Sequence, residues 1–174
     1  LVFFTTPKVG CTVWGKLFRR MMGHKNWKTA LPHNPQNNGL SYLSDYNLSK
    51  ATEIMNDPSY TKAIFLRDPK ERFLSAYLDK IKRNEFGSLC CNKNITAGKS
   101  CVSDAQSFSG FIKVTQTTCK DNDHWMPQSK RMESIFLSKL DLIGHMETVE
   151  LDSKRLLERI GAWEEFGSTG WGPP

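Results

Sequence analysis

The sequence predicts an α/β fold in which a mainly parallel sheet is flanked by helices. Three short apolar runs, at residues 1–5, 63–66 and 140–143, have the length and composition of buried strands. Each run is followed by a segment whose apolar residues recur every three or four positions, as on one face of a helix. This alternation gives a parallel sheet, because each crossover helix returns the chain to the same end of the sheet.

Length and charge limit the classes of function. The 174 residues are 39% hydrophobic, enough to build one domain around its own core, which we expect to occupy residues 1–166. Residues 167–174 are rich in glycine and proline and should form a loose tail. The formal charge of +6 favours an anionic partner. Because the basic residues stand singly or in pairs, nucleic acid is not the expected partner.

The beginning of the sequence predicts a fragment. The chain starts inside a strand-like run, so we expect the parent protein to continue before Leu1. No stretch approaches the roughly 20 apolar residues that cross a bilayer. A membrane anchor of the parent protein would therefore lie outside this fragment.

The cysteines predict an oxidising compartment. Four of the five are crowded into one polar stretch: Cys90, Cys91, Cys101 and Cys119. An even set of this kind indicates disulfides, with free buried thiols as the alternative. The two adjacent cysteines are not expected to pair with each other, so each should bond either Cys101 or Cys119. Glycosylation sequons at Asn47 and Asn94 also point to a secretory compartment and a glycoprotein.

The first strand leads through a glycine-bearing loop into a helix. The apolar residues of this helix are Trp14, Leu17, Phe18, Met21 and Met22, and Gly23 closes it. Residues 24–43 are rich in Asn, Pro and Gly and should form a loop. A second helix is expected over residues 48–55 and should end near Asp57.

The second strand is followed by the most strongly signalled helix of the chain. Asp68 is placed to cap it and Pro69 to occupy its first position, and its apolar pattern continues to about Asn84. An irregular, cysteine-bearing segment should follow to about residue 103 and a further helix over residues 108–115. The third strand and a helix after Asp152 complete the pattern.

The loop between the first strand and the first helix has two possible phosphate-binding frames. One frame, Gly10-x-x-x-x-Gly15-Lys16, resembles a nucleotide-triphosphate loop, but Leu17 stands where a hydroxyl should hold magnesium. The other frame has Lys8 before the turn, Gly10 within it and Thr12 at the start of the helix, and it needs no metal. The helical spacing that begins at Trp14 favours the second frame.

Two motifs together resemble the Golgi carbohydrate sulfotransferases of the chondroitin and dermatan type. "PKVGCT" followed by a tryptophan resembles their 5′-phosphosulfate loop, and "RDPKERFLSAYLDK" resembles their 3′-phosphate motif. "DNDHWMPQ" and "LDLIGHMETV" resemble two later segments of the family. The resemblance implies a P-loop-like sulfotransferase fold and the donor 3′-phosphoadenosine 5′-phosphosulfate (PAPS), without a metal.

The resemblance also implies the residues that bind the donor. The 5′-phosphosulfate would be held by the loop residues Lys8, Val9, Gly10, Cys11 and Thr12. The 3′-phosphate would be held by Arg67 and Ser75, although a surface ion pair and a helix contact are the plainer roles for these two. Gly15 departs from the family, which usually has a lysine or another helix former there. In an exposed helix interior this glycine should cost about 1 kcal/mol.

Sulfuryl transfer needs a charge at the leaving oxygen and a base at the acceptor hydroxyl. Lys8 is expected to supply the charge. The candidate bases are His124 and His33, with Glu147 as a carboxylate alternative. Trp125 is either a platform that binds the sugar ring or a core aromatic.

The function implied by the resemblance is transfer of a sulfuryl group from PAPS to a hydroxyl of a glycan. The parent chain would be a type II membrane protein with this domain in the Golgi lumen. Two alternatives stay open: a sulfotransferase for a non-glycan alcohol, and a glycan-binding module that has lost turnover. The sequence specifies neither the acceptor sugar nor the oligomeric state.

Overall fold

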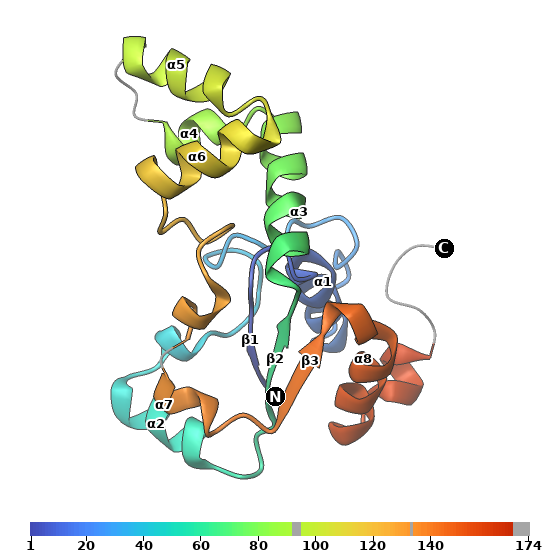
Figure 1. Cartoon of the computed structure of the whole chain (residues 1–174). Coiled ribbons are helices and arrows are strands. Elements are labelled where there is room, and N and C mark those ends of the chain that lie inside the picture. The colour runs from blue at the N-terminus through green and yellow to red at the C-terminus, as the bar shows by residue number, and fades with distance from the viewer. Residues whose placement is uncertain (92–94, 133, 169–174) are drawn as a thin grey trace. The chain divides into compact units, whose positions relative to one another are not determined.

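The computed structural model describes residues 1–91, 95–132 and 134–168, and it divides the chain into two compact units (Figure 1). The sheet unit comprises Leu1–Thr5, Val9–Leu66 and the chain from Ser134 onward. The helical unit comprises Thr6–Lys8 and Arg67–Glu133. The expectation of one domain over residues 1–166 stays a prediction.

The sheet is parallel and has three strands in the order β1-β2-β3 (Figure 1). The strands are β1 (Val2–Phe4), β2 (Lys62–Leu66) and β3 (Leu142–His145). In the register of the sheet, Phe3 lies opposite Ala63 and Ile64 opposite Ile143. The predicted α/β class with a parallel sheet is confirmed. β3 begins two residues later than expected. Asp141, which was expected in the strand, lies just before it, and its carboxylate accepts a hydrogen bond from the backbone N–H of Lys62.

Helices pack on both faces of this sheet. They are α1 (Cys11–Met21), α2 (Leu48–Asn56), α7 (Ser134–Leu137) and α8 (Val149–Arg159). Phe3, Ala63 and Phe65 point to one face, where they share a core with α1 and α8. Val2 and Phe4 point to the other face, toward α2 and α7. This alternation follows from the two-residue period of a strand.

The helical unit is built on the predicted capped helix. Its helices are α3 (Pro69–Lys82), α4 (Phe86–Cys90), α5 (Ile95–Asp104) and α6 (Phe108–Thr118). Asp68 caps α3, since its carboxylate accepts hydrogen bonds from the N–H groups of Lys70 and Glu71 at 2.9 and 3.0 Å. The core of the unit includes Ala76 of α3 and Phe111 of α6.

The cysteine-bearing segment is mostly helical, so the expectation of an irregular segment was wrong. It forms α4 and α5, which are tied down by the disulfides Cys90–Cys119 and Cys91–Cys101. These bonds are one of the two pairings that the sequence left open. They supply covalent constraints where the sequence has too few regularly spaced apolar residues to predict a helix. Asn94, in the second sequon, lies outside the described residues.

The last described residues form a helical turn, and the predicted loose tail over residues 167–174 stays a prediction. Trp163–Gly167 form a π-helical turn in which Gly167 is buried. A Cβ at Gly167 would lie 2.2 Å from the Trp163 ring, so the close approach of this ring requires glycine. Residues 169–174 lie outside the described part of the chain.

Candidate active site

The chain bends sharply in the loop over residues 7–12. Gly10 and Lys8 both have a φ of 69°, a left-handed conformation that is uncommon for lysine. The first backbone bond of α1 runs from the N–H of Trp14 to the carbonyl of Gly10 at 3.0 Å. Because the first N–H groups of a helix have no partner within it, the start of α1 at Cys11 is suited to bind an anion.

The position of α1 decides between the two phosphate-binding frames. A nucleotide-triphosphate loop would need Val13 and Trp14 in its bend, but both lie within α1. Trp14 is also only 1% exposed and belongs to the core of the sheet unit. The backbone therefore fits the shorter frame with Lys8 and Thr12.

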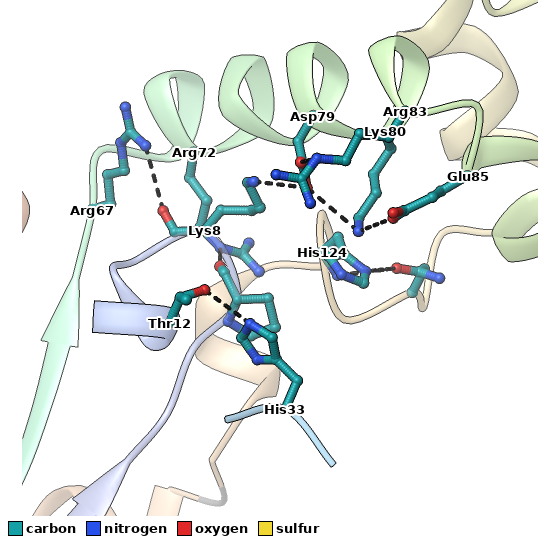
Figure 2. Close-up of polar contacts among 12 residues, drawn as sticks. Lys8, Thr12, His33, Arg67, Arg72, Asp79, Lys80, Arg83, Glu85 and His124 are labelled. Atoms are coloured by element: carbon teal, nitrogen blue, oxygen red, sulfur yellow. Dashed lines mark hydrogen bonds and ion pairs between the residues drawn. The ribbon is translucent and has the colours of Figure 1, made fainter. Parts of the chain in front are cut away.

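Two of the predicted site residues meet in the sheet unit. Thr12 Oγ1 and His33 Nε2 are 2.8 Å apart, at hydrogen-bonding distance (Figure 2). His33 is exposed and comes from the long loop between α1 and α2. The alternative base, Glu147, is an exposed residue of the short turn Met146–Thr148.

Gly15 allows this loop to pack against α1. We expected Gly15 in an exposed helix interior, which was wrong because Gly15 is buried. A Cβ at Gly15 would lie 2.7 Å from the Cβ of Pro32, closer than packed carbon atoms approach. The buried Asn38 side chain holds the loop by donating a 2.8 Å hydrogen bond to the Pro32 carbonyl. Together these contacts bring the next residue, His33, to Thr12.

The helical unit contains a cavity of about 410 Å³ that brings three of the predicted donor-binding residues together. These are Lys8, Arg67 and Ser75, and the cavity follows α3 past Ser75 to Arg83. Arg67 and Ser75 could bind one ligand only if α3 ran alongside that ligand. The cavity does extend along α3, so a ligand within it could reach both residues. The charged residues of its lining are the cationic Lys8, Arg67, Lys82 and Arg83 and the carboxylates Glu71 and Asp79. Because cationic side chains outnumber carboxylates, the cavity favours an anionic ligand.

Asp79 is a residue of this cavity that sequence analysis missed. The Lys8 ammonium lies 3.0 Å from its carboxylate, which Arg83 also approaches at 2.9 Å and Lys80 at 3.4 Å (Figure 2). Burial works against the charged carboxylate, but the hydrogen bonds and charges of Lys8 and Lys80 outweigh it and lower the pKa of Asp79. Its position one helical turn after Ser75 could have indicated that both face the same cavity.

Arg67 lies between α3 and the loop. Its guanidinium donates a 3.4 Å hydrogen bond to the Lys8 carbonyl (Figure 2). It also lies 3.5 Å from the Glu71 carboxylate. The surface ion pair weighed as the plainer role of Arg67 is therefore present. Exposed pairs at this spacing contribute only about 0.3–0.5 kcal/mol, so an anionic ligand can compete for the guanidinium. The Gln128 side chain fixes the Arg67 backbone by bonding both its N–H and its carbonyl.

One cavity thus contains residues from both sequence motifs. A sequence profile described as the sulfotransferase family matches residues 1–171. The chain belongs to the sulfotransferase family.

Several curated sulfotransferases are similar to this chain. Carbohydrate sulfotransferase 9 of Homo sapiens is 27% identical over 180 residues, which cover 95% of this chain and 40% of that protein. Carbohydrate sulfotransferase 10 of Danio rerio is 28% identical over 185 residues, covering 92% and 50%. Carbohydrate sulfotransferase 11 of Mus musculus is 27% identical over 180 residues, also covering 92% and 50%. The chain spans half or less of the length of these relatives. No solved structure matches it significantly.

His124 of this sulfotransferase is half-buried in the helical unit. Its Nδ1 and its backbone N–H both lie within 3.0 Å of the Asn122 side-chain oxygen (Figure 2). Because this oxygen only accepts, Nδ1 carries the proton and Nε2 keeps a lone pair. Burial, followed by the positive charges of Lys80 and Lys8, lowers the pKa of His124 to about 4. His124 is therefore neutral at pH 7 and able to accept a proton, although it is a weak base.

Trp125 lies in the core of the helical unit. It is 6% exposed and packs against the rings of Phe86 and Phe111. Its indole N–H donates a 2.8 Å hydrogen bond to the Cys119 carbonyl. Of the two roles considered, this packing favours the core aromatic and gives no support to a sugar platform.

A second cavity, of about 520 Å³, lies in the sheet unit of the sulfotransferase. It begins at Gly10 of the loop and is lined mainly by apolar side chains of α1, the turn Met146–Thr148, α8 and the π-helical turn, among them Val13, Met146 and Trp163. In the described part of the chain, no three metal-ligating side chains come together, and no helix has the length and apolar character to span a membrane. The expectation of a metal-free site stays a prediction.

Proposed function

We propose that this sulfotransferase moves the sulfuryl group of PAPS to a hydroxyl of a carbohydrate, with a P-loop-like fold around the donor. The observation that carries the proposal is the cationic cavity that Lys8, Arg67 and Ser75 line together. The names of the relatives, which are carbohydrate sulfotransferases, support the carbohydrate acceptor. A donor with two separated anionic groups explains why the chain carries two phosphate-binding motifs.

Each end of the donor has its own binding residues in this proposal. Arg67 and Ser75 hold the 3′-phosphate, which does not react. The loop residues Val9, Gly10, Cys11 and Thr12 hold the 5′-phosphosulfate through their backbone N–H groups and the start of α1.

The reaction is a direct displacement at sulfur. The acceptor oxygen forms a bond to sulfur while the bond from sulfur to the bridging phosphate oxygen breaks, and the electron pair of this bond stays on that oxygen. Lys8, which is already held next to the cavity by Asp79, stabilises the growing negative charge there. The acceptor proton passes to the lone pair of a neutral histidine.

Two histidines stay candidates for this base. In His124 it is Nδ1, and not Nε2, that bonds the Asn122 side chain, so the lone pair of Nε2 can accept a proton. His124 also belongs to the same unit as Lys8. His33 is exposed to solvent and contacts Thr12 of the donor loop. We propose His124 first because it lies close enough to Lys8 for that charge to lower its pKa.

The product 3′,5′-adenosine bisphosphate should stabilise the protein without magnesium. At 100 times its Kd, a ligand that binds only the folded state adds about 2.7 kcal/mol. In a chain of this size this corresponds to a rise in Tm of about 5 °C or more, measurable by differential scanning fluorimetry. ATP with magnesium should have a much smaller effect. Equal stabilisation by ATP that requires magnesium would contradict the proposed donor.

We propose that the protein is a Golgi membrane protein of type II with the present domain in the lumen. The two disulfides and the exposed Asn47 sequon support an oxidising, glycosylating compartment. Peptide mapping of protein from animal cells should therefore find both disulfides and a glycan on Asn47. Asn47→Asp is the control, because it removes the sequon. The aspartate carboxylate can still accept the hydrogen bond from the backbone N–H of Lys50 by which Asn47 caps α2. Free thiols and an unmodified Asn47 would contradict this location.

A further inference from the structure

Arg72 is a buried cation whose contacts join two loops of the helical unit. Its side chain belongs to α3 and is 3% exposed. The guanidinium donates to three backbone carbonyls, those of Pro7 at 2.9 Å, Met126 at 2.7 Å and Asp123 at 2.7 Å. Burial, and to a smaller extent the charge of Arg131, lowers its pKa to about 10, so it is still charged at pH 7.

These three carbonyls flank the residues that we assign to the chemistry. Pro7 immediately precedes Lys8 in the chain. Asp123 immediately precedes His124, and Met126 follows two residues later. The planar guanidinium carries five N–H groups in a fixed fork, so it can fix several acceptors in one plane, whereas an ammonium offers a single point of contact. Arg72 thus holds the backbone next to Lys8 and the backbone on both sides of His124.

We infer that Arg72 is a positioning residue that holds Lys8 and His124 in a fixed relation to each other. The inference rests on the proposed function for the roles of these two residues, and on the three carbonyl contacts for the mechanism. Arg72 touches neither the donor nor the acceptor. It acts because a displacement of about 1 Å in a reacting group can lower a rate by about 100-fold.

Arg72→Lys should separate positioning from folding. A lysine keeps the charge but can satisfy only part of the three-carbonyl network, so kcat should fall at least tenfold while the affinity for 3′,5′-adenosine bisphosphate changes less than threefold. Arg19→Lys is the matched control, since Arg19 is also 3% exposed and donates to Asn26 within the sheet unit. Both variants should lower Tm, and only Arg72→Lys should lower kcat. Equal losses of kcat in the two variants, or full activity in Arg72→Lys, would overturn the inference.

The titration of His124, followed by NMR of the histidine rings, gives a second readout that needs no enzymatic activity. The charged groups that act on this ring are Lys8, Asp79 and Lys80 from the loop and α3, and Asp123 from its own loop. If Arg72 holds the loop closed around His124, Arg72→Lys should admit water and raise the pKa of His124 by at least one unit toward 6.5. Arg19→Lys should leave it unchanged.

The titration also separates this inference from the proposed function. A shifted His124 pKa in a protein that transfers no sulfate would support the positioning and contradict the function. An unshifted pKa together with an unchanged kcat would overturn the positioning. If Arg72→Lys does not fold, Arg72→Gln, which keeps two N–H donors without the buried charge, is subject to the same two criteria.

Discussion

Lys8→Ala should lower kcat by on the order of 100-fold or more, which is the usual loss when one stabiliser of a developing oxyanion is removed. Charge grows on the bridging oxygen only as the sulfuryl group leaves, so Lys8 should interact more strongly with the transition state than with bound donor. The affinity for 3′,5′-adenosine bisphosphate should therefore change less than kcat. Steady-state kinetics at saturating donor and calorimetry with the bisphosphate measure the two effects.

The structure indicates that Lys8→Ala will fold. The φ of 69° at residue 8 is as unfavourable for lysine as for alanine, so the substitution adds little backbone strain. Asp79 keeps Arg83 at 2.9 Å and Lys80 at 3.4 Å, so its carboxylate is not left without a counter-charge. Lys50→Ala, which removes an ion-paired lysine of the sheet unit, is the matched control and should be fully active. Normal turnover in Lys8→Ala would show that Lys8 does not act in the chemistry.

Arg67→Ala should have the opposite signature, with a raised donor KM and a largely preserved kcat. In the proposed donor complex its guanidinium binds a phosphate that does not react, and hydrogen bonds to charged groups contribute about 1.5–3 kcal/mol. The donor KM and the Kd of the bisphosphate should therefore rise by on the order of 10- to 100-fold. Steady-state kinetics over a wide range of donor concentration gives both constants.

A control for Arg67 comes from the sheet unit. Arg159 is a half-exposed arginine that forms a 2.9 Å ion pair with Asp141, and Arg159→Ala should leave the donor KM unchanged. If Arg67→Ala lowers kcat at saturating donor and leaves the KM unchanged, Arg67 acts in the chemistry or holds Lys8 through its carbonyl contact. In that case the assignment of Arg67 to the 3′-phosphate would be wrong.

The fold was predictable where local signals and burial agree. Asp68 and Pro69 mark the start of α3, and the apolar run of β2 is followed by a helix, so both elements could be located from the sequence. The helices α4 and α5 were missed because two disulfides contribute to their stability, and the sequence does not specify which cysteines pair. Gly15 was misjudged for a related reason: its role depends on Pro32, which lies 17 residues away in a loop without regular structure.

The candidate site could be predicted only as far as its motifs extend. Lys8, Arg67 and Ser75 could be proposed because they belong to two motifs that resemble phosphate-binding segments, and the structure brings them to one cavity. Asp79 and Arg72 also lie in the second motif. The spacing of Asp79 from Ser75 places it on the same face of α3, but no signal in the sequence distinguishes Arg72 from a surface charge of a helix. Their roles follow from contacts with backbone and side chains of another segment, which only the folded chain provides.

The most direct test of the central claim is to follow the sulfuryl group itself. PAPS with a radiolabelled sulfate is incubated with the protein and a mixture of tissue glycans, with small alcohols in a parallel reaction and Lys8→Ala as the blank. We expect label to appear on a glycan, one 3′,5′-adenosine bisphosphate to form for each sulfate transferred, and the blank to lose both. Label on small alcohols alone would contradict a carbohydrate acceptor. Bisphosphate binding with no transfer to any acceptor would show a binding module and contradict the account.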